Sequence, residues 1–131
     1  MVYDEYISRK SNYLCYLVFM KVGNFYQTFD DDAVIMNYLF GYKIKDNRVG
    51  FPISSFNKII NKLDKSNINY FIDDIEKRFD NNNYSSLLEK SNDILELKID
   101  FDNIYSYLYS NIERKYIRRV VNKIKDVIDE G

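Results

Sequence analysis

Two side chains suited to reading a nucleic-acid base stand two residues apart, directly after a turn. Phe25 offers a flat apolar ring, and the Gln27 amide can both donate and accept a hydrogen bond. The apolar run 16–22 predicts a strand before them, and Gly23-Asn24 favours a tight turn. Since side chains alternate faces along a strand, Phe25 and Gln27 are expected on one face. The stretch therefore predicts a hairpin whose tip could contact a base.

The other residues that could take part in catalysis or metal binding have simpler structural explanations. Asp30, Asp31 and Asp32 could in principle hold a metal, but an Asp30 N-cap and an acidic first turn for a helix at 33–40 account for them. The absence of histidine excludes His-based acid–base chemistry and His-ligated metals. Cys15, in an apolar run, is predicted to be a small buried hydrophobe. We expect no catalysis, no metal and no cofactor.

The elements that must position the tip follow from periodicity and turn residues. We predict helices at 3–10, followed by a turn at 11–12, at 33–40 and at 56–63, and strands at 16–22, 25–29, 42–45, 48–51 and 68–72. Asp46-Asn47 suits a two-residue hairpin turn, and Gly41 a helix end. These elements make an α/β fold, a mixed β-sheet packed with helices. Residues 1–75 form the predicted core domain, and residues 76–131 a helical C-terminal extension.

The tip also carries a family resemblance. The segment Val22–Phe29, VGNFYQTF, followed by Asp31-Asp32-Ala33, resembles the motif of the N-terminal mismatch-recognition domain, domain I, of the MutS family of DNA mismatch repair proteins. Gly50-Phe51-Pro52 resembles the family's Gly-hydrophobic-Pro, and the likeness covers roughly residues 3 to 72. The resemblance implies that Phe25 is a wedge beside a mispaired base. Gln27 stands where the family has a glutamate, which removes a negative charge and puts base discrimination in question.

Two functions remain open on this basis. The first is a DNA-binding module that recognises mismatched or distorted duplex DNA through Phe25, with Gln27, Asn24, Lys21 and Arg48 as further contacts. No Walker-type loop is present, and a formal net charge of −1 predicts weak binding that needs a partner or self-association. The alternative is a protein-interaction scaffold of the same fold that binds no DNA. A solvent-facing Phe25 would favour the first function, and a buried Phe25 would exclude it.

The C-terminal extension is predicted as a helix at 84–98 and a last helix from Asp100 or Asp102 to about Asp129. The second half of the last helix is amphipathic. Its apolar face holds Tyr116, Ile117, Val120, Val121, Ile124, Val127 and Ile128, and its basic face holds Arg114, Lys115, Arg118, Arg119, Lys123 and Lys125. Such a helix could pack on its own domain, bind a partner or a second copy, contact phosphates or lie on a membrane.

The sequence lacks the long apolar segments that are typical of secreted and membrane-spanning proteins. The first ten residues hold no apolar core of signal-peptide length, and no stretch reaches about 18 apolar residues. We therefore expect a cytoplasmic protein that does not span a membrane.

Overall fold

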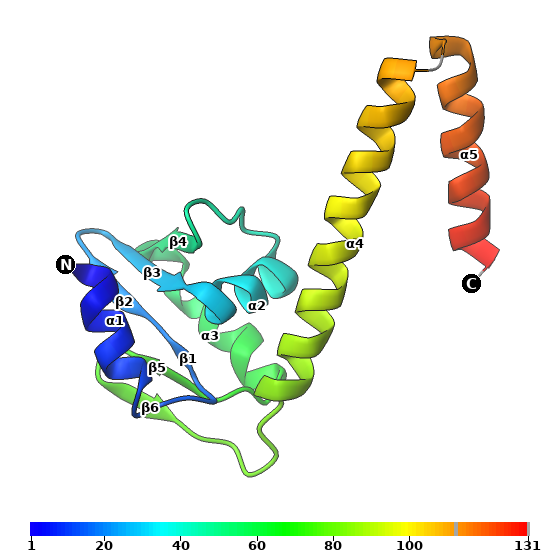
Figure 1. Cartoon of the computed structure of the whole chain (residues 1–131). Helices are drawn as coiled ribbons and strands as arrows, with labels where there is room; N and C mark the ends of the chain where they lie inside the picture. The colour runs from blue at the N-terminus through cyan, green and yellow to red at the C-terminus, as the bar shows by residue number, and fades with distance from the viewer. Residues whose placement is uncertain (112, 131) are drawn as a thin grey trace. The chain divides into compact units, whose positions relative to one another are not determined.

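The computed structural model describes residues 1–111 and 113–130, which form two compact units (Figure 1). The sheet unit is Met1–Leu95, and the helical unit is Glu96–Gly131. The elements in chain order are α1 (Val2–Lys10), β1 (Leu17–Val18), β2 (Met20–Val22), β3 (Phe25–Phe29), α2 (Asp30–Phe40), β4 (Arg48–Pro52), a 3-10 turn (Ile53–Ser55), α3 (Phe56–Lys65), β5 (Tyr70–Ile72), β6 (Ile75–Lys77), α4 (Tyr84–Asn111) and α5 (Arg114–Glu130). The predicted α/β fold is confirmed.

The strands divide into two three-stranded sheets. The first has the order β1-β5-β6, with β1 parallel to β5, and the second is the antiparallel sheet β2-β3-β4. The single strand predicted at 16–22 is therefore wrong. The run breaks at Phe19, whose N–H donates to the Phe71 carbonyl at 3.0 Å, and it supplies one strand to each sheet.

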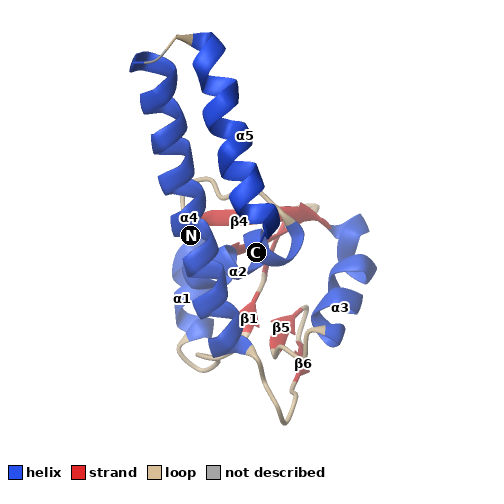
Figure 2. Ribbon diagram, turned by 90° about the vertical axis from the view of Figure 1, so that its right-hand side faces the viewer, coloured by secondary structure: helices blue, strands red, loops and turns tan. Residues whose placement is uncertain are grey.

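Both faces of this apolar run are buried, which explains why it contains so few polar residues. Leu17 and Phe19 join the larger core, formed with residues of α2 and α3. Val18 and Met20 point to the other face and join a smaller core with Tyr6 of α1. The strands β1 and β5 accordingly lie between α1 and α3 (Figure 2).

Two tight turns share the same conformation. Asp46 and Asn47 have φ of 53° and 59°, which confirms the predicted two-residue turn, since a type I′ hairpin needs positive φ at both positions. The strand predicted at 42–45 is absent, and only Lys45 forms an isolated bridge to Arg48. Asp73 and Asp74, with φ of 50° and 61°, turn β5 into β6, a strand that the sequence analysis missed.

The helices of the sheet unit mostly follow the predictions. Gly41 ends α2 with φ of 74°, in the left-handed conformation expected of a C-terminal glycine. Asp30 is not the N-cap: Phe29 holds that position, while Asp30 takes φ of 52° and donates its N–H to the Asn47 carbonyl. The apolar side chains of α3, Phe56, Ile59, Ile60 and Leu63, pack in the larger core.

Three other expectations need correction or comment. Cys15 is exposed rather than buried. The C-terminal helices divide differently from the prediction, because α4 continues to Asn111 and the last helix begins at Arg114. The side chains of Arg114 and Lys115, predicted on the basic face, lie outside the described part of the structure. None of the described helices is long and apolar enough to cross a membrane.

Candidate nucleic-acid interface

Phe25 stands at the open end of the antiparallel sheet. It begins β3 directly after the Gly23-Asn24 turn, where Gly23 has φ of 60°. In the sheet register Phe25 lies between Val22 and Pro52, and side chains opposite one another on neighbouring strands share a face. All three are exposed, and the Phe25 ring is 50% accessible to solvent. The tip is therefore a small apolar row that the fold leaves uncovered.

Gln27 lies on the same face as Phe25, about 7 Å further along β3. Its cross-strand neighbours are Met20 and Gly50, and a Cβ built on Gly50 would lie 3.7 Å from the Gln27 Cγ. That distance is an ordinary van der Waals contact, so Gly50 and Gln27 are close neighbours on this face. The Gln27 Oε1 atom is buried and has no hydrogen-bond partner among the described residues. The site therefore combines the exposed Phe25 ring with this unpaired hydrogen-bond acceptor of Gln27.

Helix α1 covers the far end of this face and leaves the tip free. The rings of Tyr3 and Tyr6 pack against Phe29 with centroids 5.3 and 5.0 Å away. The Arg48 guanidinium carbon lies 5.3 Å from the same Phe29 ring. Because Arg48 pairs with Phe29 in the register, it shares the face of Phe25, about 13 Å along the strand. Phe25, Gln27 and Arg48 therefore lie on one face of the sheet.

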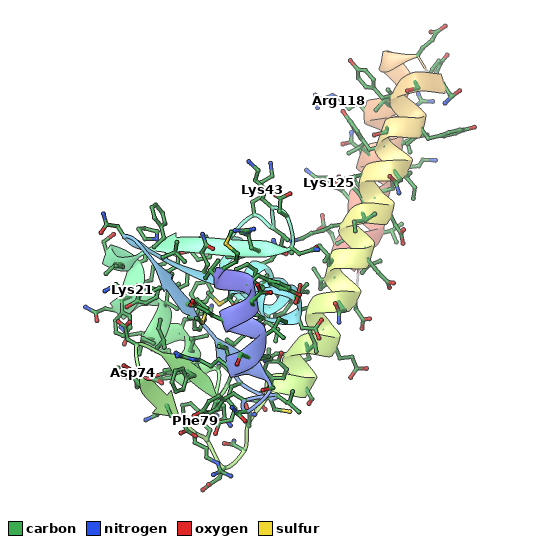
Figure 3. The ribbon with its side chains drawn as sticks, turned by 60° about the vertical axis from the view of Figure 1, so that its left-hand side comes forward. Lys21, Lys43, Asp74, Phe79, Arg118 and Lys125 are labelled. Atoms are coloured by element: carbon green, nitrogen blue, oxygen red, sulfur yellow. The ribbon has the colours of Figure 1, made fainter. Side chains whose placement is uncertain are left out.

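Lys21 and Asn24 sit differently. Lys21 pairs with Tyr26, so it belongs to the opposite face of the hairpin from Phe25, and it points into solvent (Figure 3). Asn24 is exposed in the turn, and its carbonyl accepts the Ile53 N–H at 3.0 Å. The structure thus brings Asn24 next to Phe25 and separates Lys21 from it.

Tyr26 anchors the hairpin from the buried face. Its ring packs against Phe51 and Phe56, and its hydroxyl donates to the Asp73 carboxylate in the β5–β6 turn. Burial and this hydrogen bond raise the pKa of Tyr26 to about 12. Asp73 therefore ties the tip hairpin, which belongs to the second sheet, to the first sheet.

Asp32 fixes the other end of β3 through a buried polar cluster. Its carboxylate accepts hydrogen bonds from the hydroxyls of Tyr6 and Tyr84, both at 2.6 Å, and from the Val18 N–H at 3.1 Å. It also forms a 2.9 Å ion pair with the Lys10 ammonium. Helix α1, strand β1 and the start of α4 thus meet at one side chain. A helix N-terminus alone does not explain Asp32.

The buried surroundings of this cluster shift the pKa values of Asp32, Tyr6 and Tyr84. Burial raises the pKa of Asp32, against the opposing effects of Lys10 and of the tyrosine hydrogen bonds. Burial and the neighbouring Asp32 raise the pKa values of Tyr6 and Tyr84. The two hydroxyls therefore stay protonated in the folded protein and serve as donors. The cluster is structural, and it contacts the end of β3, because the Tyr6 hydroxyl also lies 3.1 Å from the Phe29 carbonyl, which accepts a hydrogen bond from it.

The sequence analysis missed a basic surface on α3. Lys58, Lys62 and Lys65 line a groove of about 530 Å³ together with Leu39 and Phe40 of α2. Their spacing of four and three residues places them on one side of a helix, which was a usable sequence signal. These lysines belong to the same compact unit as the tip and offer positive charge that the tip itself lacks.

Comparison with known proteins agrees with this geometry. Residues 2–91 match the MutS domain I family. No curated protein sequence matches the chain. The matched region contains all the strands, the tip and the residues of the Asp32 cluster. Because the match covers more than half of the 131 residues, this protein belongs to the MutS domain I family.

Proposed function

We propose that this protein is a DNA-binding module that recognises mismatched or distorted duplex DNA by inserting Phe25 beside a weakly stacked base. Membership of the MutS domain I family implies a role in mismatch recognition. The observation that carries the finer proposal is the exposure of Phe25, half accessible at the end of the β2–β3 hairpin. The protein acts by binding alone, without chemistry or a cofactor of its own.

Selectivity for defective DNA follows from the cost of unstacking. An apolar wedge must separate two stacked base pairs, which costs a few kcal/mol in a regular duplex. A mismatch has already lost part of that stacking and pairing, so the same insertion costs less there. A wedge therefore distinguishes damaged from intact duplex without reading sequence.

Gln27 supplies the polar part of the contact. Its buried acceptor has no partner among the described residues, and an unsatisfied buried group costs about 1 to 3 kcal/mol. If the side chain rotates toward solvent, an N–H at the edge of a displaced base would satisfy this acceptor. Because the amide is neutral and can also donate, we expect Gln27 to accept more kinds of base edge than a carboxylate would.

The wedge is tested by fluorescence anisotropy at low salt with G·T-mismatched, unpaired-T and fully paired duplexes. We expect the wild type to prefer the two defective duplexes, and Phe25→Ala to lose about ten- to hundredfold in affinity for them, the value of one base–aromatic stack. The matched control is Ile75→Ala. Ile75 is 48% exposed and also follows a two-residue turn, but in the other sheet.

The outcomes separate the two functions. If Phe25→Ala binds all three duplexes as the wild type does, the wedge is wrong. If the wild type binds none of them, the exposed tip is better explained as a protein-interaction surface. With a wedge established, Gln27→Glu should narrow the range of mispairs that are bound.

Phosphate contacts are tested through the salt dependence of binding. We expect Lys58, Lys62 and Lys65 to neutralise phosphates, since the tip surface itself offers only Arg48. Replacing the three lysines with alanine should make the slope of log affinity against log salt shallower by about 2 to 3. Replacing Lys43, Lys45 and Lys77 instead, three exposed lysines outside this groove, serves as the control. Equal slopes for the two triple variants would contradict the assignment.

A further inference from the structure

The helical unit buries very little of its apolar surface. It consists of the outer part of α4 and the antiparallel helix α5 beside it (Figures 1 and 2). Among its described side chains only Ile117 is buried. Two helices alone cannot bury an apolar core, because each helix covers only one side of the other. A unit of this kind is expected to be completed by further helices.

Part of the exposed apolar surface of α4 forms an ordered stripe. Leu97, Phe101, Ile104 and Leu108 follow one another at spacings of four, three and four residues, the pattern of a coiled-coil seam. Leu97 is 62% exposed and Ile104 is 52% exposed, while Leu108 is half-buried. We call these four residues the α4 stripe. A seam repeated over three turns indicates a helical partner rather than a small ligand.

The protein's own α5 occupies a different side of α4. Tyr105 and Tyr109, stacked with their ring centroids 6.2 Å apart, line a groove of about 410 Å³ together with Ile117 and Val121 of α5. At 3.6 residues per turn, these tyrosines lie about 90° around the helix from the α4 stripe. In a four-helix bundle each helix meets two neighbours on adjacent sides. In this unit α4 has one neighbour, and the stripe lies where a second would pack.

Charge indicates that the second neighbour comes from another copy. The outer part of α4, residues 96–111, carries three acidic side chains and one basic, whereas α5 carries six basic and three acidic. Arg118 and Lys125 lie on the same side of α5, two turns apart (Figure 3). A two-fold axis would place the acidic α4 of one copy beside the basic α5 of the other, twice over. DNA fits this stripe poorly, because Glu96, Asp100 and Asp102 belong to the same segment.

We infer that the helical unit is a homodimerisation element, in which the α4 stripe of each copy packs against α5 of the other copy to form a four-helix bundle. The dimer contains two Phe25 tips, so it can bind a DNA molecule at two points. Such bivalency compensates for the weak affinity expected of a single module with a net charge of −1.

The test compares two isoleucines on one helix. Ile104 and Ile99 are both 52% exposed, but Ile99 lies about 140° around α4 from Ile104, away from the stripe. The full chain is studied by sedimentation equilibrium without DNA. We expect a dimer for the wild type and for Ile99→Asp. For Ile104→Asp we expect at least about 100-fold weaker dimerisation, because it places an unpaired charge in the interface.

Helix content provides a second measurement, because the pair of helices α4 and α5 could unfold when the dimer is weakened. Circular dichroism at 222 nm should show a concentration-dependent loss of helix in Ile104→Asp and none in Ile99→Asp. A wild type that stays monomeric at about 100 µM would overturn the inference, because even a weak dimer is populated at that protein concentration. So would equal effects of the two substitutions, or association that requires DNA. Since the sedimentation experiment contains no DNA, its result is independent of the proposed wedge.

Discussion

Replacing Asp32 with alanine is expected to lower the free energy of unfolding by about 3 to 5 kcal/mol. The carboxylate is fully buried and holds four donors, from Tyr6, Lys10, Val18 and Tyr84. Without it, a largely buried ammonium loses its counter-charge, and a buried backbone N–H and two hydroxyls lose their acceptor. Chemical denaturation followed by circular dichroism measures the loss.

Asp31→Ala is the matched control for this substitution. Asp31 lies one residue earlier in the first turn of α2 and is exposed. If Asp32 acted only through the helix dipole, the two substitutions would have similar effects, of about 0.3 to 1 kcal/mol each. We expect Asp31→Ala to stay in that range. Equal losses for the two variants would show that the buried cluster contributes nothing beyond the dipole.

Alkaline pH should destabilise the protein steeply. The pKa values of Tyr6 and Tyr84 are raised above the ordinary 10.0 by burial and by Asp32. In the unfolded chain these tyrosines lose their protons above pH 10, whereas the folded protein keeps them. Their contribution to stability is therefore complete below pH 10 and is lost above it, at about 1.4 kcal/mol per pH unit for each tyrosine. By pH 11.5 the two together should cost about 4 kcal/mol.

Denaturation midpoints between pH 8 and pH 11.5 test this expectation, with tyrosinate absorbance at 295 nm reporting ionisation. Tyr6→Phe should start from a lower stability and show a shallower fall above pH 10, since one of the linked protons is gone. Tyr107→Phe, at a position 66% exposed, should keep the slope of the wild type. A flat wild-type profile, or an unchanged slope in Tyr6→Phe, would contradict the prediction.

The parts of the site that were predictable are those set by local rules. The alternation of a strand placed Phe25 and Gln27 on one face, and the composition of Gly23-Asn24 placed the turn before them. The same rules also predict that Lys21 lies on the opposite face from Phe25. A two-residue turn pairs Val22 with Phe25 and therefore Lys21 with Tyr26, on the other face.

Other features depend on contacts between distant residues and leave no local signal. Asp32 looks like an ordinary residue of a first helical turn, because its partners come from positions 6, 10, 18 and 84. The break at Phe19 is equally invisible, since a continuous apolar run suits one buried strand or two. Cys15 was misplaced for a related reason, as an apolar neighbourhood in sequence does not settle which side chain faces the core.

The division of one apolar run between two sheets has a consequence for biosynthesis. The antiparallel sheet uses residues 20 to 52 without interruption, so its strands can pair as soon as they leave the ribosome. Strand β1 must wait for its parallel partner, because Leu17 pairs with Tyr70. Pairings between residues far apart in the chain form slowly. We therefore expect the hairpin that carries Phe25 to form early on the nascent chain, and to be fixed against the rest of the domain only when β5 docks.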